Sequence, residues 1–94
     1  MESSPYYKTG KDIISPATLL SFEQGWQAPT AEEVRAVTHM TNLTGKQIAD
    51  LIGVTSRTIR RYIGGEKPIH YAEWRLLLIY VGLITPELKP DVGT

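Results

Sequence analysis

The sequence contains no cysteine, which excludes disulfide bonds and thiolate metal sites and is typical of proteins in a reducing compartment. It also lacks a long hydrophobic run, since the longest, Leu76–Val81, is far too short to span a bilayer. Its first residues do not combine a basic start with an apolar stretch, so no secretion signal is predicted. We therefore expect a cytoplasmic protein with no membrane association.

Signatures of catalysis are missing as well. The sequence has no nucleophile motif and no glycine-rich phosphate loop, and its 94 residues allow one modest domain without a deep cleft. His39 and His70 lie far apart in the sequence without a third ligand, so no metal site is expected. The adjacent carboxylates Glu32 and Glu33 fall in the first turn of a predicted helix, where the helix dipole explains them. We predict that the protein is not an enzyme and needs no cofactor.

The net charge is zero, because 10 basic residues balance 10 acidic ones, but the charges are unevenly distributed. Residues 44–75 carry six basic and three acidic side chains, a net +3, whereas residues 1–43 sum to −2 and residues 76–94 to −1. The basic residues of this segment are Lys46, Arg57, Arg60, Arg61, Lys67 and Arg75. A local excess of positive charge is what a phosphate-binding face requires.

Hydrophobic periodicity predicts helices at residues 31–41, about 45–52, about 56–63 and 70–82, and no regular strand pattern is present. The predicted fold class is all-α, a small bundle of four to five helices. A fifth, short helix is left open near residues 15–25. This helix would begin at Pro16 with Ser15 as its N-cap and would end at Gly25. Its apolar side would consist of Leu19, Leu20 and Phe22.

The pattern also predicts how the chain is divided. Residues 1–29 form an N-terminal extension that is partly flexible, because residues 1–12 show no periodicity, and the proline-containing residues 85–94 form a flexible C-terminal tail. Residues 30–84 form the helical domain between them.

Three threonines mark the starts of the first three helices. Thr30 is followed three residues later by Glu33, and Thr44 by Gln47, so each pair is predicted to form a capping box. Thr55 is predicted to cap the third helix. Gly53 ends the second helix, where the chain needs a left-handed conformation.

The second and third helices, with the turn around Gly53, have the pattern of a helix-turn-helix. Ala49 must be small because the backbones of the two helices approach each other there. A set of apolar side chains is predicted to be buried and to hold the two helices at a fixed angle, so that the outer face of the second is a rigid probe. This set is Ile48, Ile52, Val54, Ile59 and Tyr62, and Leu51 is predicted to be buried together with Ile48 and Ile52.

The stretch Leu43–Gly65 resembles the XRE-type helix-turn-helix of phage Cro and repressor proteins. The positions that match the family's small residue, turn glycine, buried aliphatic and aromatic pair and closing glycine are Ala49, Gly53, Ile59, Tyr62 and Gly65. The family often has glutamine at the start of the first motif helix, where this chain has Gly45 followed by Lys46. The resemblance covers residues 30–84 and implies a phage-repressor-like domain that binds operator DNA.

On the third helix, Ser56, Arg57, Arg60 and Arg61 share the face opposite Ile59 and Tyr62. These four match the family's base- and phosphate-contacting positions. The planar fork of arginine pairs with guanine O6 and N7 or clamps a phosphate. We expect Arg57 and Arg60 to contact bases and Arg61 the backbone. The other predicted DNA-binding residues are Ser56, Thr55 (mainly a cap), Lys46 and Lys67.

The predicted function is sequence-specific binding of double-stranded DNA as a transcriptional regulator, with repression favoured over activation. The fourth helix has two apolar stripes, and only one can cover the helix-turn-helix. The second stripe consists of Leu76, Ile79, Tyr80 and Leu83. A second subunit in a homodimer or the chain's own residues 13–26 would cover it. The alternative function is an antitoxin-like or adaptor protein, whose N-terminal extension and fourth helix bind a protein partner.

Overall fold

The computed structural model describes residues 14–86, which form four α-helices, a short 3-10 helix and no β-strand. The helices are η2 (Pro16–Leu19), α2 (Ala31–Met40), α3 (Gly45–Ile52), α4 (Ser56–Gly64) and α5 (Tyr71–Val81). The predicted all-α fold class is confirmed for this part of the chain. The predicted flexible tail at residues 1–12 lies outside the described residues, as do residues 87–94 of the predicted C-terminal tail.

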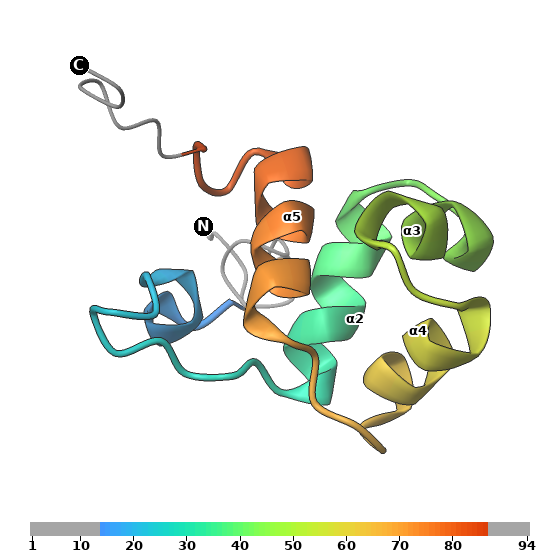
Figure 1. The fold of residues 1–94 in the computed structure, drawn as a ribbon, viewed down its shortest axis with the longest axis horizontal. Coiled ribbons are helices and arrows are strands. Elements are labelled where there is room, and N and C mark those ends of the chain that lie inside the picture. Colours follow the sequence, from blue (N-terminus) through green and yellow to red (C-terminus); the bar gives the residue numbers. More distant parts are fainter. Residues whose placement is uncertain (1–13, 87–94) are drawn as a thin grey trace, which may run out of the picture.

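Helices α2 and α5 lie side by side in the middle of the molecule (Figure 1). Helices α3 and α4 contact each other and pack on one side of this pair, with α4 against α2 and α3 against α5. The segment 14–26 lies on the other side of this pair, away from α3 and α4 (Figure 1). No helix in residues 14–86 is long and apolar enough to cross a membrane.

The predicted helix starts are confirmed by their hydrogen bonds. The Thr30 hydroxyl accepts from the Glu33 N–H at 3.2 Å, and a Glu33 carboxylate oxygen accepts from the Thr30 N–H at 2.7 Å. Thr44 and Gln47 form the same reciprocal pair at the start of α3, at 3.1 and 2.9 Å. These bonds satisfy backbone donors that have no partner inside the helix, so sequence-local chemistry determines where α2 and α3 begin.

One hydrophobic core joins the four α-helices to the residues before and after them. Trp74, Leu77 and Leu78 of α5 have no exposed surface, so this side of α5 packs against the rest of the core. Burial of each such side chain stabilises the fold by about 1.5–3 kcal/mol. The buried hydrophobic residues are Ile14, Val34, Val37, Ile48, Ala49, Ile52, Ile59, Tyr62, Ile69, Trp74, Leu77 and Leu78.

The segment 14–29 is attached to α5 because side chains of α5 donate hydrogen bonds to backbone carbonyl groups of the segment. The indole N–H groups of Trp26 and Trp74 both donate to the Thr18 carbonyl oxygen, each at 3.0 Å. The Arg75 guanidinium donates to the carbonyl oxygens of Leu19 and Leu20 at 2.9 and 3.1 Å. Because Thr18 and Trp74 are both buried, this part of the N-terminal segment completes the core.

Glu33 attaches the same segment to α2. Its second carboxylate oxygen accepts from the Ser15 N–H at 2.7 Å, so one buried side chain caps α2 and also holds the chain before η2. Both bonds run from a backbone N–H to a carboxylate, and such charge-assisted bonds are among the stronger hydrogen bonds in proteins.

Two expectations about buried side chains are wrong. The short N-terminal helix is the 3-10 turn η2, which ends at Leu19 and not at Gly25, and Leu20 and Phe22 beyond it are 37% and 69% exposed. Leu51 is 38% exposed, because the buried side of α3 is centred between Ile48, Ala49 and Ile52 and Leu51 lies beyond its edge. Because Ala49 is part of the buried face of α3, the centre of that face lies farther from Leu51 than the apolar pattern of Ile48, Leu51 and Ile52 predicts.

Candidate nucleic-acid interface

Helix α4 has one buried face and one open face. The Thr55 hydroxyl accepts from the Thr58 N–H at 3.1 Å and begins the helix, while Gly65 ends it in the left-handed conformation with φ 81°. Ile59 and Tyr62 are each 2% exposed. Since a helix turns by about 100° per residue, Arg57 lies opposite this buried pair.

The open face forms a shallow hollow lined by four charged residues, Arg57, Arg60, Arg61 and Glu66. Its volume is about 590 Å³, and all four residues are exposed. The structure therefore brings together the three arginines predicted as DNA contacts. It adds Glu66, which sequence reasoning did not select although it directly follows the glycine that closes the helix.

The turn between α3 and α4 is held by two bonds to one carbonyl group. The Ala49 oxygen accepts from the N–H groups of Gly53 and Val54, at 2.8 and 2.9 Å. Gly53 has φ 80°, a conformation that costs little for glycine. Ala49 is 2% exposed where the two helices pack together, as its small size predicted. The angle between α3 and α4 is thus determined by backbone bonds as well as by packing.

Two further bonds hold α4 against its neighbours. The Tyr62 hydroxyl donates to a Glu73 carboxylate oxygen of α5 at 2.6 Å, and the same oxygen accepts from the His70 N–H at 3.3 Å. Burial raises the pKa of the Tyr62 hydroxyl above its ordinary value, and the bond to Glu73 raises it further. The Arg35 guanidinium of α2 donates to the Ile63 carbonyl oxygen at 2.8 Å. The open face is therefore presented by a helix that is bonded to both α2 and α5.

The remaining predicted contacts lie outside the arginine hollow. Ser56 is half-buried, and Thr55, besides its cap, has its hydroxyl 3.0 Å from that of Thr58. Lys46 forms an exposed ion pair with Asp50 at 3.5 Å, with 79% of its side chain accessible. Such a pair contributes little to stability, so the Lys46 ammonium can exchange Asp50 for another anion at little cost.

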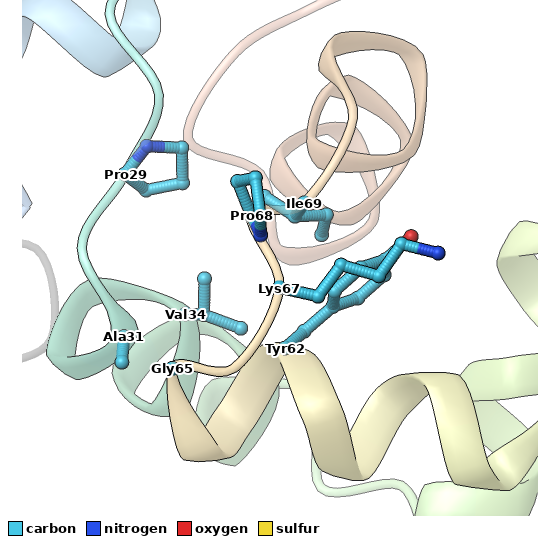
Figure 2. Close-up of a pocket in the computed structure, with 8 residues that line it drawn as sticks. All are labelled: Pro29, Ala31, Val34, Tyr62, Gly65, Lys67, Pro68 and Ile69. Atoms are coloured by element: carbon cyan, nitrogen blue, oxygen red, sulfur yellow. The ribbon is translucent and has the colours of Figure 1, made fainter.

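Lys67 lines a second, smaller pocket behind the end of α4, shown in Figure 2. This pocket has a volume of about 180 Å³ and lies between the start of α2 and the segment that joins α4 to α5. Its lining is mostly apolar: Pro29, Ala31, Val34, Tyr62, Gly65, Lys67, Pro68 and Ile69. Lys67 lines this pocket and not the hollow that holds the three arginines.

Within residues 14–86 no cluster of three metal-ligating side chains is present, and His39 and His70 do not line a common pocket. What the open face of α4 presents is three guanidinium groups, which bind phosphate or the acceptor atoms of a guanine edge.

No protein-family model matches the chain, and no solved structure matches it. Two relatives from Escherichia coli, each named transcriptional repressor protein KorC, are 46% and 41% identical to it over 61 residues. In both comparisons the match spans 62% of this chain and 72% of the relative. At this identity and coverage, the chain belongs to the KorC family of transcriptional repressor proteins.

Proposed function

We propose that this protein is a transcriptional repressor that binds specific double-stranded DNA with α4 in the major groove. Helices α3 and α4 would then be an XRE-type helix-turn-helix, with α4 as the recognition helix. The observation that carries the proposal is the arginine hollow: three guanidinium groups on the open face of a helix whose other face is buried and bonded to α2 and α5. The name of the two relatives supports repression as the outcome.

The proposed contacts use the open face of α4, where Arg57 lies opposite the core with Arg60 and Arg61 on its two flanks. Arg57 and Arg60 are assigned to guanine edges and Arg61 to a phosphate. Ser56, at the start of the helix, faces a base or a phosphate. Thr55 acts mainly as a cap.

Two lysines are assigned to the backbone on either side of the groove. Lys46, near the start of α3, and Lys67, after the end of α4, flank the two-helix unit in the sequence. Phosphate contacts of this kind orient a protein on the duplex without carrying sequence information. Because they release counterions, we expect binding to weaken steeply as salt rises.

A selection of bound sequences from random duplex DNA tests the proposal directly. The protein is expected to enrich a short common sequence that contains guanines, and a reporter promoter that carries this sequence should be silenced when the protein is present. The double variant Arg57→Ala, Arg60→Ala is the control and should not enrich that sequence. Failure of the unaltered protein to enrich any sequence would overturn the proposal.

We further propose that the protein acts as a homodimer joined through α5. Leu76 and Tyr80 are 44% and 50% exposed, Ile79 is half-buried, and Ala72 completes a face of α5 without a charged side chain. Residues 14–26 contact the other side of α5, at Tyr71, Trp74 and Arg75, and leave this face open.

A second copy of the chain would bury the face against an identical one in two-fold symmetry. Such a dimer would read two half-sites roughly one helical turn of DNA apart. An antitoxin-like or adaptor role, with a different protein on the same face, is the alternative that the measurement of mass below distinguishes.

A further inference from the structure

Glu66 is an acidic residue in the arginine hollow, and its position there is determined by the end of α4. Its N–H donates to the Arg61 carbonyl oxygen at 2.9 Å, directly after Gly65 has reversed the chain. A Cβ atom on Gly65 would lie 3.2 Å from the Ala31 Cβ atom, so this reversal packs closely against the start of α2. The fold therefore holds Glu66 beside the three arginines.

Glu66 does not neutralise an arginine through a close ion pair. Among residues 14–86, the ion pair that the structure contains is Lys46–Asp50, and none joins Glu66 to Arg57, Arg60 or Arg61. The carboxylate instead lines the open hollow together with the three guanidinium groups, so its negative charge acts on any ligand that binds to them.

A carboxylate in this place responds differently to the two parts of a DNA duplex. It repels phosphates, since both are negative and the interaction decays only over a Debye length. Base edges in the major groove carry no net charge, so they do not repel the carboxylate as phosphates do. When the arginines contact only phosphates, the hollow lies on the backbone and Glu66 is close to those charges. When Arg57 and Arg60 contact bases, Glu66 faces base edges as well.

We propose that Glu66 is a specificity-determining residue that penalises binding to the phosphate backbone alone. The inference rests on the proposed function, since it concerns the same hollow. It assigns to Glu66 the suppression of binding to random DNA, which would otherwise compete with the preferred site for three clustered arginines.

The test compares Glu66→Gln with the unaltered protein on two duplexes: the sequence enriched by selection and a random duplex of equal length. Glutamine keeps the size of the side chain and removes its charge. Affinity for the random duplex is expected to rise about three- to tenfold, and affinity for the enriched sequence less than twofold, so discrimination falls. Glu66→Asp, which keeps the charge, should retain most of the discrimination.

Glu23→Gln is the matched control, because Glu23 is an exposed carboxylate in the turn after η2, outside the hollow, and its loss should leave the ratio of the two affinities unchanged. Circular dichroism verifies that each variant is folded. Equal rises for both duplexes would reduce Glu66 to a contribution to net charge and overturn the inference. So would a lost preference at one base pair, which would make Glu66 a base reader. If the unaltered protein shows no preferred sequence, both the proposed function and this inference fail. If the Glu66→Gln variant discriminates between the two duplexes as well as the unaltered protein does, only this inference fails.

Discussion

The three arginines of α4 share its open face but are assigned different roles in the proposed complex. Arg57 lies opposite Ile59 and Tyr62, and Arg60 and Arg61 lie on its two flanks. A guanidinium that pairs with a guanine contributes to the choice of sequence, whereas one that pairs with a phosphate contributes to affinity for any duplex.

Replacement of Arg57 or Arg60 with alanine should therefore weaken binding to the preferred site by about 1–3 kcal/mol and blur the preference at one or two base pairs. Arg61→Ala should weaken binding to all duplexes about equally and lower the salt dependence by about one phosphate contact. Titrations at several salt concentrations on specific and random duplexes measure both effects. Unchanged binding in all three variants would show that this face of α4 is not the interface.

Tyr62 makes the stability of the fold depend on pH, because the pKa of its buried hydroxyl is raised. Tyr62→Phe removes the bond to Glu73 and should lower the free energy of unfolding by about 1 kcal/mol near neutral pH. The raised pKa of the hydroxyl means that the unfolded chain loses this proton before the folded one does. The stability that Tyr62 contributes is thus present below about pH 10 and decreases as the pH rises further.

Denaturant unfolding at pH 7 and pH 11 tests this prediction. The control is Tyr80→Phe, since Tyr80 is 50% exposed and should respond little to the same change. A difference between unaltered and Tyr62→Phe protein that stays constant between the two pH values would contradict the linkage.

At the scale of elements, the packing of α3 on α4 depends on one small residue. Ala49→Leu adds three carbon atoms to a side chain that is 2% exposed, and such overpacking typically costs about 1–3 kcal/mol. We expect a lower melting temperature together with weaker DNA binding, because the angle between the two helices would change. Asp50→Leu places the same side chain at the next, exposed position and should leave the melting temperature nearly unchanged. Retained stability in Ala49→Leu would mean that position 49 is not at the crossing of the two helices.

The whole molecule raises the question of what covers the open face of α5. Leu76→Glu places a charge on this face at a residue that is 44% exposed, so the monomer should still fold. If two copies meet there, the unaltered protein has twice the mass of the chain in solution and the variant has the mass of one. The variant should also bind a two-half-site duplex more weakly. Sedimentation equilibrium measures this mass. An unaltered protein that stays monomeric at high concentration would exclude the homodimer. A complex with a different protein would favour the antitoxin-like or adaptor role.

The N-terminal segment contributes hydrogen bonds and buried side chains to the core. Removal of residues 1–28 takes away the bonds of Ser15 and Thr18 to Glu33 and Trp74 and uncovers part of the core. The loss of these bonds and of the burial of Ile14 and Trp26 should cost about 3 kcal/mol or more. Phe22→Ala, at a side chain that is 69% exposed, serves as the control and should change the melting temperature little. An unchanged melting temperature after the deletion would show that the helices are stable alone.

The sequence by itself determined the helices and the turn between α3 and α4. Capping at Thr30, Thr44 and Thr55 and the left-handed glycines at positions 53 and 65 depend on bonds between residues a few positions apart, so local chemistry is sufficient to place them. The outward direction of Arg57, Arg60 and Arg61 followed from the same helical periodicity.

Only the tertiary structure decided how distant segments meet. The packing of distant elements determines that Thr18 accepts hydrogen bonds from two tryptophans and that Glu33 binds the Ser15 N–H. The same packing leaves Leu51 exposed. The presence of Glu66 in the arginine hollow depends on the path of the chain after Gly65. Periodicity specifies which face of a helix is apolar but not which neighbour covers it, because burial is a property of the assembled core and not of a segment of sequence.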